Sequence, residues 1–223
     1  MAIWRGKSAV PTIGPEFHLK YKVFGGGTGY NAEASRAVGL ARQMLTSTNT
    51  LMNGGWAGFT AAQKDYLQYY FQQGNAAPSA TTLDVIKQTY ILIRNGMFST
   101  DLNLKVTIDG DANGYVNSHK SGSKKANHNM GVRGGNSVTR GDIHLDSDRL
   151  DGDPEWAAKT TIHEASHKFA STADFGKIGY TDDATFKFRK AGLTAAQAIN
   201  NAESYAMFAM MSFMYPNATP PGY

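Results

Sequence analysis

The chain of 223 residues contains no cysteine. This absence excludes disulfide bonds, cysteine zinc fingers, iron–sulfur clusters and cysteine nucleophiles. It does not identify a compartment, because a cysteine-free chain tolerates oxidising and reducing surroundings alike. A chain of this length favours a single domain over residues 1–223, which can bury a core large enough to fold without a covalent staple.

Long hydrophobic runs are also absent, and no stretch approaches the length of a membrane span. Residues 1–14, MAIWRGKSAVPTIG, lack the continuous apolar core of a secretory signal peptide. We therefore expect no membrane span and leave the compartment unknown. Export by a secretion machine that needs no such signal is one hypothesis that this pattern allows.

The chain has little excess charge of either sign. Its net charge is +4, from 22 lysines and arginines against 18 aspartates and glutamates, whereas nucleic-acid binding usually needs a concentrated basic face. The densest basic stretch, residues 120–125, places three lysines among serine and glycine, and we interpret it as a solvated loop. We therefore expect no nucleic-acid partner.

Hydrophobic patterning predicts an α+β fold. Helices and strands follow one another in blocks and do not alternate in βαβ order. We expect an irregular segment over residues 1–16 and a C-terminal tail over residues 216–223. The expected strands cover 17–24, 102–109 and 141–150, and the expected helices cover 32–44, 61–72 with Thr60 as its cap, 83–98 with Thr82 as its cap, a helix opened by Pro154, and a last helix from Thr194 to near Pro216.

A long polar stretch, rich in glycine, asparagine, serine and lysine, covers residues 110–140. A stretch of that length in a compact domain is usually functional or contains a hairpin. Residues 109–117, DGDANGYVN, resemble the first half of an EF-hand loop, so Ca²⁺ is an alternative ligand here. The twelfth position is Lys120 where an EF-hand carries a bidentate glutamate, which favours an ordinary turn.

The chemistry is concentrated in residues 161–176, TIHEASHKFASTADFG. Because a helix turns about 100° per residue, His163 and His167 point the same way and can bind one metal ion. Glu164 lies beside that ion, where it can take a proton from a bound water. The alternative is an ordinary helix with two solvent-facing histidines. We favour a zinc site, because the flanking residues place an apolar face opposite the histidines.

A catalytic zinc ion takes three protein ligands and leaves a fourth position for water. No histidine follows His167 in the sequence, so the third ligand is a carboxylate. The candidates are Asp174, Asp182, Asp183 and Glu203. Glu203, on the next long helix, would complete a thermolysin-like set, and Asp174 would complete an aspartate set.

The segments HEASHKFASTADF and NAESYAMFA resemble the deuterolysin and peptidyl-Lys metalloendopeptidase family, the aspzincins. Members of that family carry H-E-x-x-H, then G-T-x-D-x-x-Y-G, then a helix with N-A-D and an aromatic residue. The match covers about 50 residues, from Thr160 to Ala209. We expect a zincin-like metallopeptidase fold, in which helices accompany a small, mostly antiparallel sheet.

Residue by residue, the resemblance implies that His163, His167 and Asp174 are zinc ligands and that Glu164 is the general base. Glu203 falls on the family's aspartate, which in lysine-specific members lines the pocket for the substrate side chain. The resemblance therefore implies Glu203 as a substrate-binding residue and a preference for lysine next to the cut.

The chain departs from the family pattern at three places. Ser171 replaces a glycine, and Lys177 replaces the tyrosine that stabilises the oxyanion. The nearest tyrosine is Tyr180, three residues further on, so Tyr180 and Lys177 are both candidates for that role. Ala206 replaces a second acidic residue of the lysine-specific members. His144, on an expected strand, is a candidate to border the substrate cleft.

Together these patterns predict a zinc metalloendopeptidase that cleaves protein or peptide substrates. One alternative is a zincin-fold amidase acting on bacterial cell-wall or other non-protein amides. Another is a binding module with weakened catalysis. Because signal peptide and cysteines are both missing, a secreted toxin or effector domain is a further hypothesis, with a delivery or immunity partner.

Overall fold

The computed structural model describes residues 18–21, 30–99, 102–107, 114–116 and 142–218. The expectations for residues 1–16, for the calcium-like turn before Gly114, for the lysines of 120–125 and for the end of the tail lie outside the described residues. The helices are α1 (Asn31–Asn53), α2 (Ala61–Tyr70), α3 (Ala80–Met97), α4 (Ser147–Asp151), α5 (Pro154–Ala170), α6 (Ala195–Ala198) and α7 (Ala202–Met214), with 3-10 turns η1 (Trp56–Gly58) and η2 (Gly176–Ile178).

The strands are β1 (His18–Tyr21), β2 (Asn103–Thr107), β3 (Gly114–Val116) and β4 (Ile143–Asp146), and they form one sheet in the order β1-β2-β4-β3. β1 pairs parallel with β2, and β2 pairs parallel with β4. Only β3 runs antiparallel, along β4. The expected mostly antiparallel sheet is therefore wrong. The long connections explain this, because α1, α2 and α3 all lie between β1 and β2, and parallel neighbours require such crossovers.

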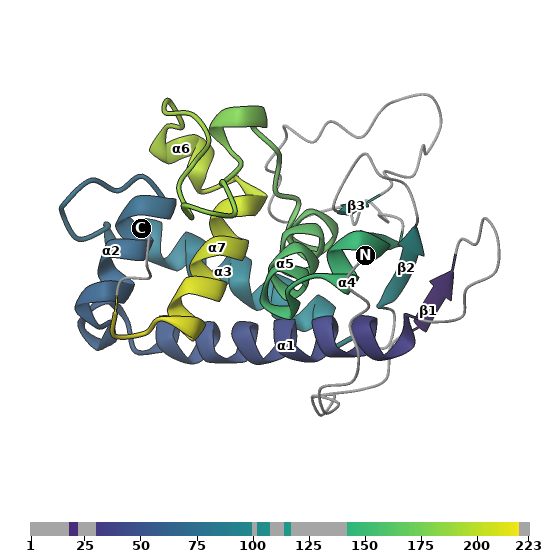
Figure 1. The fold of residues 1–223 in the computed structure, drawn as a ribbon. Coiled ribbons are helices and arrows are strands. Elements are labelled where there is room, and N and C mark those ends of the chain that lie inside the picture. The colour runs from purple at the N-terminus through teal and green to yellow at the C-terminus, as the bar shows by residue number, and fades with distance from the viewer. Residues whose placement is uncertain (1–17, 22–29, 100–101, 108–113, 117–141, 219–223) are drawn as a thin grey trace, which may run out of the picture.

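The α+β class is confirmed, and α5 occupies its centre. This helix packs on α1, α3 and α7, and its other side contacts β3 and β4. Figure 1 shows α1 along the lower edge of the molecule, with α5 and α7 crossing above it. α5 is thus held from several directions, which gives any side chain it carries a fixed position.

Some of the helix caps predicted from the sequence are present in the structure. Asp153 caps α5 by accepting from the amides of Glu155 and Trp156, and Pro154 occupies the first turn as expected. Thr60 caps α2 in a capping box with Gln63. The other helix limits differ from expectation: α1 continues to residue 53, α3 is capped at residue 79 and not at 82, and the strand expected over 141–150 ends early, where α4 begins.

The helix expected from Thr194 to near Pro216 is broken into α6 and α7. Thr194 does form a capping box, but α6 ends after four residues. The helix is interrupted because its backbone forms hydrogen bonds with the segment around Ala173. The amide of Ala173 donates to the carbonyl of Asn200, and the amide of Ala202 donates to the carbonyl of Ala173. The Asn201 side chain donates to the carbonyl of Gly179. This break sets Glu203 in the first turn of α7.

The C-terminal end of α5 is fitted closely onto α3. A Cβ atom added to Gly96 would lie 2.0 Å from Cγ of Phe169, so a side chain at this position would displace the ring. Several methionines of α7, among them Met207, Met210 and Met211, are buried in the same hydrophobic core. In the part of the chain that the structure describes, no helix is long and apolar enough to cross a bilayer.

Candidate metal centre

α5 brings together the two histidines and the glutamate of the motif. His163, Glu164 and His167 are all buried, with exposed fractions of 4%, 4% and 5%. The planes of the two imidazoles are nearly perpendicular, and their Nε2 atoms lie 3.2 Å apart. The i, i+4 spacing therefore gives the shared direction that helix geometry predicts, and the histidines do not point into solvent.

The turn after α5 returns the chain to these histidines. Ser171, at the C-cap, has φ 58°, in the left-handed region that reverses the chain after a helix. Ala173 then forms a parallel bridge with Asn201. This path places Oδ1 of Asp174 at 3.2 Å from Nε2 of both His163 and His167.

The three atoms form a triangle whose sides are 3.2 Å. A tetrahedral zinc ion with ligand bonds of about 2.0–2.2 Å separates its ligand atoms by roughly 3.3 Å. The triangle therefore matches one face of a zinc tetrahedron, and the donor set of two imidazoles and a carboxylate suits that ion. The side chain of Asp174 is 44% exposed. The remaining ligand position of the tetrahedron therefore faces the solvent side of the cluster.

The outer nitrogens of both imidazoles are engaged by acceptors. Nδ1 of His167 donates to the carbonyl of Thr172 at 2.9 Å. Nδ1 of His163 donates to Oε2 of Glu203, also at 2.9 Å. Because a carbonyl and a carboxylate can only accept, both histidines carry their proton on Nδ1, and Nε2 is left for a metal ion.

Glu203 is enclosed, with an exposed fraction of 1%. Its Oε1 accepts from Nζ of Lys159 at 2.6 Å and from the amide of Thr181 at 3.1 Å, and the Thr181 hydroxyl adds a further bond. Burial raises the pKa of this carboxyl, but Lys159 and His163 outweigh burial and lower it below its usual value. Glu203 is therefore an ionised carboxylate behind the first histidine.

Glu164 lies on the other side of the cluster. Its Oε1 is 4.0 Å from Nε2 of His163. Burial raises the pKa of this carboxyl, although the two histidines oppose the shift. The backbone of β3 passes close to this side chain, since a Cβ atom added to Gly114 would lie 3.1 Å from Cγ of Glu164. A buried carboxylate with a raised pKa, beside a metal position, suits a general base.

Tyr180 lies over the first histidine. Its ring stacks on His163. Burial and the charge of Asp174 raise the pKa of this phenol well above its usual value. The phenol is therefore protonated at neutral pH and can donate a hydrogen bond beside the metal position.

The remaining sequence candidates are not members of this cluster. Lys177 is exposed on η2. His144 is buried on β4 and is not a member of the three-residue cluster. Asp182 caps a local turn by accepting from the amides of residues 184 and 185, and Asp183 pairs with Arg149 at 3.0 Å. Among the described residues, the cluster that could hold a metal ion is His163, His167 and Asp174.

Without a metal ion, His163 and Asp174 shift each other's pKa. Burial lowers the pKa of His163, but hydrogen bonds to Asp174 and Glu203 outweigh it and raise the value to about 10. The same contacts act in the opposite direction on the acid: burial raises the pKa of Asp174, and the two histidines bring it well below its usual value. The metal-free cluster therefore binds a proton that a metal ion must displace.

Comparisons with known proteins give a fold and no family. No family model matches the sequence, and no curated protein sequence matches it. A solved structure, that of a zinc peptidase from Grifola frondosa, superposes with a TM-score of 0.57 over 84% of this chain and 98% of that one. The two chains share one fold. At 15% identity, this likeness describes the arrangement of the backbone.

Sequence reasoning missed two residues of the site, Lys159 and Thr181. Lys159 lies four residues before His163, so helical periodicity alone placed it on the same face. Thr181 had no comparable signal, because its contact with Glu203 depends on how the segment after η2 packs against α7.

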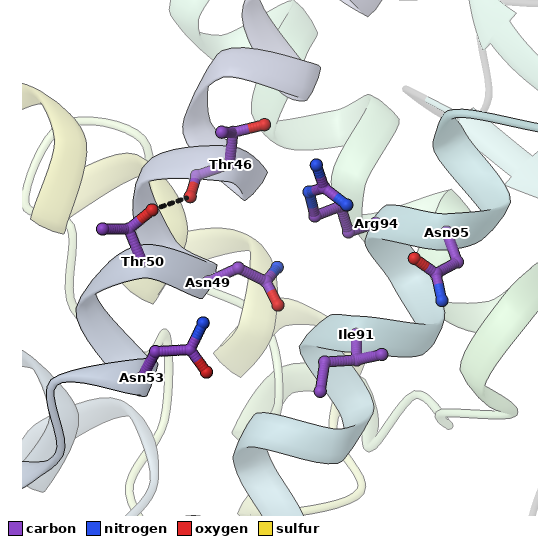
Figure 2. Close-up of a pocket in the computed structure, with 7 residues that line it drawn as sticks. All are labelled: Thr46, Asn49, Thr50, Asn53, Ile91, Arg94 and Asn95. Atoms are coloured by element: carbon purple, nitrogen blue, oxygen red, sulfur yellow. Dashed lines mark hydrogen bonds between the residues drawn. The ribbon is translucent and has the colours of Figure 1, made fainter.

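A groove between α1 and α3 has a different character (Figure 2). It encloses about 280 Å³ and is lined by Thr46, Asn49, Thr50, Asn53, Ile91, Arg94 and Asn95. Its lining holds neither a histidine nor a carboxylate, so the groove offers none of the ligands or bases that the cluster on α5 provides.

Proposed function

We propose that this protein is a zinc-dependent endopeptidase of the aspzincin type. The observation that carries the proposal is the triangle of donor atoms on His163, His167 and Asp174, with sides of 3.2 Å. The shared fold with a zinc peptidase supports it, as does the motif resemblance around the same residues.

The residues of the chain divide the chemistry between them. Zinc, when bound, supplies Lewis-acid polarisation and a more acidic water. Glu164 accepts a proton from the attacking water and passes it to the leaving amine, a role that its buried carboxylate and raised pKa favour. Tyr180 donates its phenolic hydrogen to the oxygen on which negative charge develops. Lys177, exposed on η2, is less suited to that role.

The resemblance also implies a preference for lysine next to the cut, which requires a carboxylate free to bind a substrate ammonium group. Glu203 already accepts from Lys159, Thr181 and His163. We therefore propose that Glu203 orients a metal ligand and that cleavage does not require lysine in the substrate.

Metal analysis combined with a digest of a peptide library tests this proposal. We expect one zinc ion per chain in both the wild type and Glu164→Gln, and cleavage by the wild type alone. Turnover by Glu164→Gln at the wild-type rate would contradict the role of Glu164. Cleavage of muropeptides, with no cleavage of peptides or casein, would favour the amidase alternative. The residues found beside the cut would report directly on the proposed indifference to lysine.

A further inference from the structure

Lys159 carries an ammonium group that is nearly enclosed by protein. The residue is 7% exposed and lies on α5, one helical turn before His163. Its Nζ is 2.6 Å from Oε1 of Glu203 and 5.3 Å from the ring centroid of Trp156. The ammonium is therefore fixed between a carboxylate and an aromatic face.

Glu203 uses its two oxygens for different partners. Oε1 faces Lys159 and Thr181, and Oε2 accepts from Nδ1 of His163. With Oε1 held in this way, Oε2 is directed at the imidazole. Removing one partner of a buried ion pair leaves the other charge uncompensated, which is strongly destabilising. The carboxylate therefore depends on Lys159 to remain in this position.

We propose that Lys159 is a positioning residue for the metal ligand His163, acting through Glu203. The ammonium holds Glu203, Glu203 holds the Nδ1 side of the imidazole, and Nε2 is thereby aimed at the metal position. Hydrogen-bond partners of metal-bound histidines typically change metal affinity by about 10–100-fold when they are removed. The inference rests on the proposed function only in taking zinc as the ion.

The test measures zinc affinity of the full chain by competition with a chelator, so it needs no peptide substrate. We expect Lys159→Met to weaken zinc binding by about 10–100-fold, and Lys159→Arg, which keeps the charge, to retain most of the affinity. Lys64→Met is the matched control, because Lys64 lies on α2, where its ammonium is 5.6 Å from the ring centroid of Trp56. Its zinc affinity should equal that of the wild type.

A double-mutant cycle separates positioning from general structural damage. If Lys159 acts through Glu203, adding Lys159→Met to Glu203→Met should change zinc affinity no further. This double variant also leaves no unpaired buried charge, so it remains informative if Lys159→Met alone fails to fold. The absorption spectrum of the cobalt-loaded protein gives a second readout, since altered ligand geometry in Lys159→Met should change its intensity, while Lys64→Met should not.

Wild-type zinc affinity in folded Lys159→Met would overturn the inference, as would a double variant that binds zinc more weakly than Glu203→Met. The proposed function fails in a different way. A wild type that binds zinc tightly but cleaves no peptide would contradict the peptidase and leave the role of Lys159 intact. A wild type that binds no zinc would contradict both.

Discussion

The phenol ring of Tyr180 stacks on the imidazole of His163, with ring centroids 5.5 Å apart and an angle of 19° between the planes. The resemblance places the family's tyrosine three residues earlier, where this chain has Lys177. The 3-10 turn η2 coils the chain between Asp174 and Tyr180, and the amide of Tyr180 donates to the carbonyl of Gly176 at 3.1 Å. A tyrosine displaced along the sequence thus lies beside the metal position.

Replacing Tyr180 by phenylalanine keeps the stacked ring and removes the hydroxyl. We expect kcat for a peptide substrate to fall by about 10²–10³-fold, the usual effect of losing one oxyanion donor, with zinc affinity unchanged. Steady-state kinetics and chelator competition measure the two quantities. Tyr69→Phe is the control, because its hydroxyl accepts from the amide of Phe188 outside the cluster. Unchanged kcat in Tyr180→Phe would contradict this role for Tyr180 and favour Lys177 as the group that stabilises the oxyanion.

Replacing Asp174 by alanine removes one corner of the donor triangle. Loss of a direct ligand should cost more zinc affinity than the roughly 10–100-fold associated with a hydrogen-bond partner of a ligand. We expect Asp174→Ala to lose its zinc on dialysis, as measured by metal analysis. Asp183→Ala, which removes an exposed carboxylate paired with Arg149, should keep its zinc. Full zinc content in Asp174→Ala would place the third ligand elsewhere.

The raised pKa of His163 predicts that zinc binding releases a proton. In the metal-free protein this pKa is about 10, above the usual histidine value of 6.5. The resulting contribution to stability is therefore fully present below about pH 6.5 and is lost as pH rises through about 10. Zinc requires the unprotonated imidazole, so we expect release of about one proton per ion at pH 7.5.

Calorimetric titration of zinc in buffers with different enthalpies of ionisation measures this release. The number of protons should decrease as pH approaches the pKa of His163. Glu203→Gln provides the comparison, because it weakens one of the contacts that raise this pKa. Zinc binding without proton release at pH 7.5 would show that His163 is already unprotonated in the metal-free protein.

The local part of the site could be predicted from the sequence, and the distant part could not. His163, Glu164 and His167 depend on helix geometry alone, which their spacing specifies. The position of Glu203 depends on the break between α6 and α7 and on its pairing with Lys159, neither of which a local pattern encodes. The prediction of a mostly antiparallel sheet was wrong for a related reason, because strand direction depends on the path of the connections between strands.

Ser171 offers a test of backbone strain next to the site. Its φ of 58° lies in the left-handed region, which costs residues with a Cβ atom about 1–2 kcal/mol. Glycine avoids this cost but loses more conformational freedom on folding, by about 0.5–1 kcal/mol. We expect Ser171→Gly to raise the free energy of unfolding by up to about 1 kcal/mol, as measured by urea denaturation of the metal-free protein. Ser171→Ala keeps the Cβ atom and should show no such gain.

The bridge between Ala173 and Asn201 bears on how this site tolerates sequence change. It consists of two main-chain hydrogen bonds, from Ala173 to the carbonyl of Asn200 at 2.7 Å and from Ala202 to the carbonyl of Ala173 at 3.0 Å. Neither bond depends on which side chain is present, provided that the side chain fits. Proline is the exception at positions 173 and 202, because it lacks the donating N–H. The segment that carries Asp174 can therefore diverge widely in evolution while its backbone still delivers the carboxylate to the two histidines.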